Sequence, residues 1–233
     1  GYTYHTTGDR ASRLEYAVFV QGEDELARSI CSLVAVAINN IKTLYDEKHD
    51  KATFVKNIIL DNILPGDIYI KSRELHFGND VPRVVFLVRQ QMPADVAAID
   101  VVTGMFPDKQ KDFVLHISET DIVVVKEVKE GSEVKDLAKI AAAIEETLQS
   151  ELSVKCLIGI GSVSSQMKDI AKSFKEAQTA IEVGAVFDTE KNIISFENLG
   201  IGRLIYQLPI TLCEMFLSEV FRKDSIDSLD QET

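Results

Sequence analysis

The order of apolar segments after Pro82 most limits what this chain can fold into. Short runs of consecutive apolar residues predict buried strands, and longer segments with apolar residues every three or four positions predict helices. The strands are expected at 83–89, 113–118, 122–128 and 154–160, and the helices at 94–105 and 132–152. This order predicts an α+β fold, a split β-α-β, ferredoxin-like sheet with helices packed on one face.

Further elements are expected around this unit. Ser132 is expected to cap the second helix, and Glu119-Thr-Asp121 is expected to join the two middle strands as a hairpin. A short helix is predicted at 67–76 before the sheet. After it come a helix at 166–184, an edge strand at 192–196 and helical pieces at 199–208 and 209–221.

A long amphipathic helix is predicted to begin near Asp24, which can cap it, and to stop at Leu64-Pro-Gly66. Its apolar residues recur at alternating spacings of four and three, with Asn40 as a polar registry position. The stripe suits a homodimer interface and, equally, a helix that packs on its own domain. The candidate interface residues are Leu26, Ile30, Leu33, Ala37, Asn40, Ile41 and Leu44.

The two ends of the sequence suggest a longer protein. Residues 1–22 hold one good strand, at 13–21, behind a polar stretch with no partner strand of its own. A lone strand is not stable, so it is expected to pair with something outside this sequence or elsewhere in it. The segment is assigned as the C-terminal remnant of an upstream sensor domain. Residues 23–77 then form a helical linker, 78–222 the main domain, and 223–233 the start of a further linker.

Charge and composition limit the partners. The net charge of −12 should repel nucleic acid and anionic lipid, so this chain is not expected to bind DNA itself. Its three cysteines and four histidines form no ligand motif, which predicts buried free thiols, no metal and no cofactor. No apolar run approaches the length of a membrane span. The protein is expected to be cytoplasmic.

One loop has the composition of an anion site. Gly159-Ile-Gly-Ser-Val-Ser-Ser165 leaves a predicted strand and enters a predicted helix, where amides and hydroxyls can hold an anion. The candidate ligand-binding residues are Gly159, Gly161, Ser162, Ser164 and Ser165. We favour a different interpretation, in which the glycines permit a tight turn and Ser164 or Ser165 caps the helix.

Two blocks of the sequence resemble the CdaR/PucR family of bacterial transcriptional regulators. The first, 159–184, combines the glycine loop with Phe174-Lys-Glu-Ala-Gln-Thr-Ala180 and ends in Gly184; the second is Phe196-Glu-Asn-Leu-Gly followed by a leucine-rich segment to Pro209. The resemblance implies a GGDEF-like middle domain. It also implies a sensor domain before it, able to take a small-molecule effector, and a helix-turn-helix domain beyond Thr233 that binds DNA.

The same resemblance allows catalysis to be judged from the residues. Diguanylate cyclases, which give this fold its name, carry Gly-Gly-Asp/Glu-Glu-Phe at the hairpin, where this chain reads His116-Ile-Ser-Glu-Thr-Asp-Ile122. Their first strand supplies a metal-binding aspartate, and this one reads Phe86-Leu-Val-Arg-Gln-Gln91. Because these carboxylates are needed to hold magnesium, no enzyme activity is expected. The sequence predicts a dimeric regulatory fragment that relays an effector signal. The alternative is a degenerate nucleotide- or phosphate-binding module of cyclase-like fold.

Overall fold

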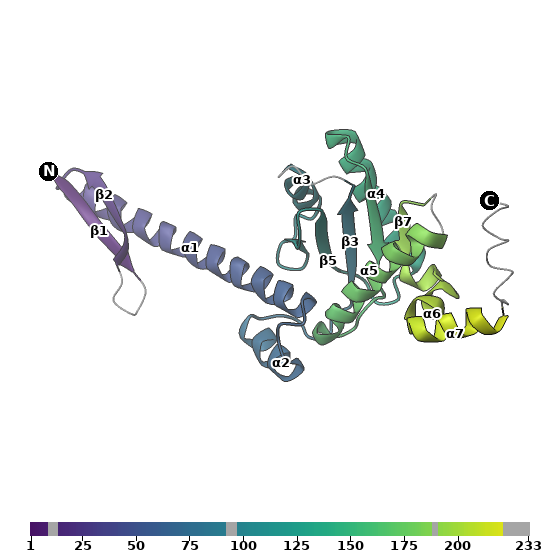
Figure 1. Ribbon diagram of the computed structural model, residues 1–233. Coiled ribbons are helices and arrows are strands. Elements are labelled where there is room, and N and C mark those ends of the chain that lie inside the picture. Colours follow the sequence, from purple (N-terminus) through teal and green to yellow (C-terminus); the bar gives the residue numbers. More distant parts are fainter. Residues whose placement is uncertain (9–13, 92–96, 188–190, 221–233) are drawn as a thin grey trace. The chain divides into compact units, whose positions relative to one another are not determined.

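The structure is a computed structural model that describes residues 1–8, 14–91, 97–187 and 191–220 (Figure 1). The chain divides into two compact units, residues 1–55 and residues 56–233. Each unit is described by itself. The boundaries expected from the sequence after residues 22, 77 and 222 remain predictions, and the expected linker at 223–233 lies outside the described residues.

The first unit begins with an antiparallel hairpin. Strand β1 (Tyr2–Gly8) pairs with β2 (Leu14–Gln21), and Tyr4 lies opposite Phe19. The expectation that residues 1–22 hold no partner strand was therefore wrong, and β2 finds its partner within the sequence. The stretch before β2 is itself a strand, because Tyr2, Tyr4 and Thr6 alternate with other polar residues and share one face of the ladder.

Helix α1 (Glu25–Ile59) follows the hairpin as one continuous helix. The Asp24 carboxylate accepts a hydrogen bond from the amide of Ala27 at 2.9 Å, which confirms the predicted cap. Within the first unit one side of α1 packs on the hairpin: Ala27, Cys31 and Ala35 are buried, and the Cys31 thiol donates to the Val18 carbonyl at 3.3 Å. The polar stretch at 45–51 does not break the helix, because Glu47 and Lys51 pair one turn apart at 2.8 Å.

The second unit starts with the last turn of α1 and with helix α2 (Pro65–Glu74). The sequence interpretation used Pro65 as a stop signal, and this was wrong: α1 ends at Ile59, and Pro65 stands in the first turn of α2. The first turn of a helix tolerates proline because an amide there has no partner within the helix.

The sheet of the second unit has the order β4-β5-β3-β6-β7. Its strands are β3 (Arg83–Gln90), β4 (Phe113–His116), β5 (Asp121–Glu127), β6 (Cys156–Ile160) and β7 (Ile193–Ser195). Neighbouring strands are antiparallel except β6 and β7, which are parallel. The first four strands have the connectivity of the split β-α-β unit, and β7 adds an edge. The predicted fold class is confirmed.

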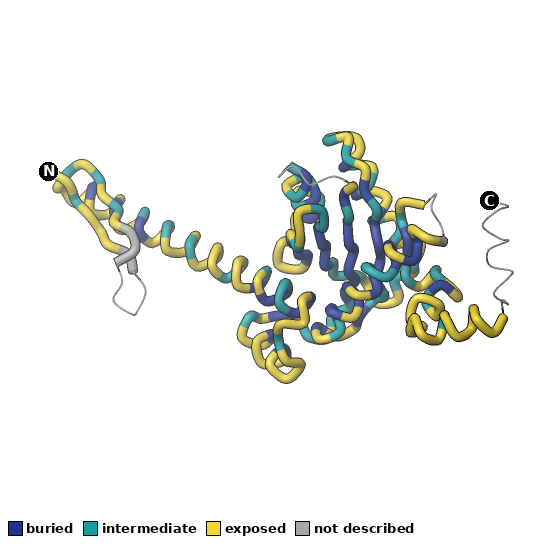
Figure 2. The backbone as a smooth tube through the Cα atoms, in the orientation of Figure 1, coloured by how far each residue is buried: buried dark blue, intermediate teal, exposed yellow. Residues whose placement is uncertain are grey.

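Helices cover both faces of this sheet. Helices α3 (Ala97–Met105) and α4 (Val134–Leu152) pack over Phe86, Ile158 and their neighbours, as expected. Helix α5 (Ile170–Phe187) lies on the other face, because it contacts Gly159, which points away from Ile158 and Ile160. The expectation of helices on one face is correct for the split unit, because α3 and α4 share a face. It did not include α5, which covers the opposite face. In Figure 2 the central strands are dark blue, since both faces are buried.

The start of α4 differs from the sequence expectation. Helix α4 begins at Val134 after Glu133, and the Ser132 hydroxyl donates to the Lys129 carbonyl instead of capping the helix. The predicted start of α3 at Ala94 lies outside the described residues.

The C-terminal part consists of short elements. A 3-10 turn η1 (Met167–Asp169) precedes α5, and a second, η2 (Phe196–Asn198), follows β7. Helices α6 (Gly202–Gln207) and α7 (Ile210–Val220) come last; no residue of α7 is buried. Among the residues the structure describes, no helix combines the length and the apolar character needed to cross a membrane.

Candidate functional site

The end of β3 and the β4–β5 hairpin beside it correspond to the metal-binding positions of diguanylate cyclases. Arg89 of β3 lies directly opposite Asp121 of β5. Its guanidinium donates two hydrogen bonds, from Nε to Oδ1 and from Nη2 to Oδ2, both 3.0 Å long. The hydrogen bond with Asp121 raises the pKa of Arg89. The acidic side chain at this position is therefore held by a bidentate ion pair.

In the hairpin turn, the hydroxyls of Ser118 and Thr120 form hydrogen bonds within the turn itself. The Ser118 hydroxyl accepts from the amides of Thr120, at 3.4 Å, and Asp121, at 3.1 Å. The Thr120 hydroxyl donates to Asp121 Oδ1 at 3.3 Å, and Glu119 is exposed. These contacts fit the interpretation of Glu119 and Asp121 as turn residues.

The glycines of the 159–165 loop serve helix packing. A Cβ atom on Gly159 would lie 2.1 Å from the Ala177 carbonyl oxygen, and one on Gly161 would lie 2.1 Å from that of Ser173. Neither glycine has the positive φ of a tight turn. The sequence interpretation gave the wrong reason for them: they allow α5 to approach the sheet, which residues with a side chain would prevent.

The hydroxyl of Ser173 on α5 joins this loop to the sheet. It donates to the Ser162 carbonyl at 2.8 Å and accepts from the Val85 amide at 3.2 Å. The Gly161 amide donates to the Val85 carbonyl at 3.0 Å. A side chain of the helix thus continues the hydrogen-bond ladder of β3 where β6 ends.

One of the candidate anion-binding residues already binds a carboxylate of the chain itself. The Ser162 amide donates to Glu176 Oε2 at 2.9 Å. Ser164 pairs through its backbone with Arg83 and donates its hydroxyl to the Gln166 carbonyl, so it does not cap a helix, and Ser165 is exposed. The adjacent cavity, about 220 Å³, is also lined by Asp169. Lys172 lines the same cavity and pairs with Glu176 at 3.8 Å. The anion site and the nucleotide- or phosphate-binding alternative stay predictions.

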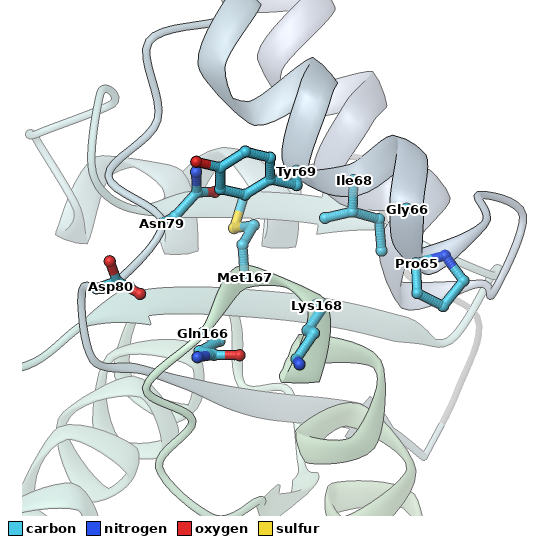
Figure 3. Close-up of a pocket in the computed structure, with 9 residues that line it drawn as sticks. All are labelled: Pro65, Gly66, Ile68, Tyr69, Asn79, Asp80, Gln166, Met167 and Lys168. Atoms are coloured by element: carbon cyan, nitrogen blue, oxygen red, sulfur yellow. The ribbon is translucent and has the colours of Figure 1, made fainter.

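A larger cavity lies beside α2, and the sequence analysis missed it. Its volume is about 420 Å³, and its walls come from the start of α2, from the turn before β3 and from η1 (Figure 3). The lining residues are Pro65, Gly66, Ile68, Tyr69, Asn79, Asp80, Gln166, Met167 and Lys168. Residues 166–168 are distant in the sequence from the other two segments, and the three share no motif, so no sequence signal marks the pocket.

One family model matches this chain. It is described as the GGDEF-like domain and matches residues 62–183, more than half of the sequence. The chain belongs to the GGDEF-like domain family. No curated protein matches the sequence. The match covers the elements from α2 into α5, so the hairpin, all of α1, strand β7 and helices α6 and α7 lie outside it.

In this GGDEF-like chain, the described residues contain no group of three or more His, Cys, Asp or Glu side chains that could hold a metal ion. Cys31 and Cys156 are buried thiols, as expected, whereas Cys213 is only half-buried. Burial raises the pKa of the Cys156 thiol to about 11, with a smaller contribution from Glu145. That thiol is therefore protonated at neutral pH.

The candidate interface residues of α1 lie on the surface of the first unit. Leu26, Leu33 and Ile41 are 67%, 73% and 66% exposed. Ile30, Ala37, Asn40 and Leu44 are also exposed. The hairpin covers a different side of α1. The alternative in which the helix packs on its own domain stays a prediction. The dimer itself stays a prediction.

Proposed function

We propose that this chain is a regulatory, non-catalytic part of a CdaR/PucR-type transcriptional regulator. In this proposal the chain dimerises through α1, and the chain relays the signal of a small-molecule effector that an upstream sensor domain binds. The signal reaches a helix-turn-helix domain that lies after residue 233 in the whole protein and binds DNA. The observation that carries the proposal is the Arg89–Asp121 pair.

The charge and the geometry of the Arg89–Asp121 pair both argue against metal-dependent catalysis. A cyclase needs acidic side chains on both strands to hold magnesium against a triphosphate. Here one strand provides the arginine and the other the aspartate, and both aspartate oxygens accept from the guanidinium. A metal ion would have to displace Arg89 and then bind beside its positive charge. This supports a role in signalling and not in nucleotide chemistry.

The dimer is supported by the exposed stripe of α1. Its residues follow the alternating spacing of four and three that brings two helices together along one seam. A twofold dimer suits a DNA-binding regulator because paired half-sites have the same symmetry. The two blocks at 159–184 and 196–209 support the regulator family.

The experiment that tests the absence of catalysis is a turnover assay. The purified chain is incubated with GTP or ATP and with Mg²⁺, and cyclic and hydrolysed products are separated by chromatography. We expect no product above a protein-free background. Product formation that disappears in Asp121→Asn would show that the site is catalytic and would refute the proposal.

The regulator role is tested on the full-length product of the gene. That protein is expected to contain a helix-turn-helix after residue 233 and to bind DNA from the regulatory region of its own gene. A full-length sequence without such a domain would contradict the assignment to this regulator family, whatever the turnover assay gives.

A further inference from the structure

The pocket beside α2 carries opposite charges at its two ends. Figure 3 places Asp80 at one end and Lys168 with the first turn of α2 toward the other. Within the described residues, neither the Asp80 carboxylate nor the Lys168 ammonium takes part in an ion pair, and both residues are exposed. The charges are therefore accessible to a molecule that enters the pocket.

The interior of the pocket between these charges is apolar. Ile68 and Met167 are 5% and 2% exposed, so their side chains form a buried floor. Tyr69 is 59% exposed and stands at the rim. A thioether, an aliphatic group and an aromatic ring together provide a surface for an apolar group, and the ring can cover such a group.

The walls of the pocket are joined to one another. The Met167 amide donates to the Asn79 carbonyl at 3.2 Å, which fixes η1 to the turn before β3. Helix α2 packs against η1. The pocket is thus formed before any ligand arrives, and its volume of about 420 Å³ is in the range of small-molecule sites.

The positive end has a second feature that favours an anion. Pro65 has no amide hydrogen, so Gly66 carries the first amide of α2, and both residues line the pocket. The start of a helix is electropositive, and Lys168 adds a full charge at the same end. Asp80 and the Asn79 side chain at the other end suit a cation or a hydrogen-bond donor.

We propose that this pocket binds a small zwitterion with an apolar group, of the size of a dipeptide. Its carboxylate faces Lys168 and the first turn of α2, its ammonium group faces Asp80, and its apolar side chains lie on Ile68, Met167 and Tyr69. A simple anion leaves Asp80 unmatched, and an uncharged apolar molecule leaves both charges unmatched.

The first experiment compares charged and capped forms of one probe. The full 233-residue chain is titrated with L-leucyl-L-phenylalanine, with its N-acetyl form and with its C-terminal amide, and amide shifts are followed by NMR. We expect the free dipeptide to shift the Gly66 and Met167 amides, and each capped form to bind about fivefold more weakly. Equal binding of all three forms, or of acetate alone, would overturn the zwitterion.

The second experiment assigns each charge to a residue. In Lys168→Ala the free dipeptide and its C-terminal amide are expected to bind equally, because the partner of the carboxylate is gone. In Asp80→Ala the free dipeptide and its N-acetyl form are expected to bind equally. If both variants keep the preferences of the unmodified chain, the proposal is wrong.

The third experiment blocks the pocket. Gly66 lines the pocket, and a Cβ added there meets no atom within 4 Å, so Gly66→Leu introduces a bulky side chain at the pocket wall without a clash at its Cβ. Gly104 in α3 has equally open surroundings and does not line the pocket, which makes Gly104→Leu the matched control. We expect Gly66→Leu to abolish binding and Gly104→Leu to leave it unchanged. Unchanged binding in a folded Gly66→Leu protein would overturn the site.

Discussion

Gln90 at the end of β3 has a buried side-chain amide that no other described residue hydrogen-bonds. It is 3% exposed, and within the described chain neither its Oε1 nor its Nε2 atom is hydrogen-bonded. Its position on the strand puts it on the same face as Phe86 and Val88, beneath α3 and α4. A buried polar group in this state costs free energy, since the unfolded chain hydrates it.

Replacing Gln90 by an apolar residue of similar size is therefore expected to stabilise the protein. We predict that Gln90→Met raises the free energy of unfolding in urea by about 1 kcal/mol. The neighbouring Gln91 is exposed, so Gln91→Met should change it by less than about 0.5 kcal/mol. An equal effect of the two substitutions would mean that burial of the Gln90 amide carries no penalty.

The contact of α5 with the loop glycines leads to a second prediction. Gly159→Ala places a methyl group against the Ala177 carbonyl and should destabilise the fold by about 3 kcal/mol, measured by urea unfolding. Gly104→Ala fills open space in a helix and should stabilise it by about 0.5 kcal/mol. If both substitutions prove neutral, α5 does not lie this close to β6.

At the scale of elements, α1 presents two distinct sides. Ala27, Cys31 and Ala35 face the hairpin, and small residues there let the helix approach the strands. Leu33 and Ile41 belong to the exposed stripe. Large exposed apolar residues along a helix need a partner surface, and the proposed partner is a second copy of α1.

Charges in the stripe should break that contact. We expect Leu33→Glu combined with Ile41→Glu to weaken self-association by about a hundredfold or more in sedimentation, because carboxylates would be buried unpaired. Ser32→Glu with Asn39→Glu adds the same charge to exposed polar positions outside the stripe and is the control. A doubly substituted stripe that dimerises like the unmodified chain would place the interface elsewhere.

The sequence predicted most of the elements because their patterns are local. The apolar runs of β3, β5 and β6 and the periodicity of α4 require no tertiary knowledge. Strand β1 was missed because Tyr2 and Tyr4 alternate with polar residues and form no apolar run. The role of Gly159 was missed because it depends on Ala177, which only the packing of α5 brings close.

The pocket beside α2 could not be predicted from the sequence, because it also depends on tertiary packing, here of three separate segments. Met167 looks like an ordinary helix residue, and Asp80 looks like a turn residue. Their common cavity exists only because a hydrogen bond joins η1 to the turn before β3. By contrast, part of the Arg89–Asp121 site could be predicted. The sequence shows that the first strand lacks the cyclase aspartate and that the hairpin acids are not adjacent, but it does not show the ion pair.

At the scale of the whole molecule, charge determines behaviour toward nucleic acid. With a net charge of −12, the 233-residue chain is expected to show no sequence-specific gel shift with duplex DNA at moderate salt. The full-length product of the gene serves as the positive control. A specific complex formed by the shorter chain would mean that a local surface of this domain reads DNA.

Because it accepts a hydrogen bond from the Val85 amide, the Ser173 hydroxyl makes hydrogen exchange of that amide a measure of the position of α5. Because the Val85 amide donates to a side chain of α5, its proton is protected only while that helix stays seated on the sheet. Its neighbours on β3 donate to strands and exchange only when the sheet itself opens. Comparing the deuterium uptake of Val85 with theirs would therefore separate a movement of α5 from an opening of the domain.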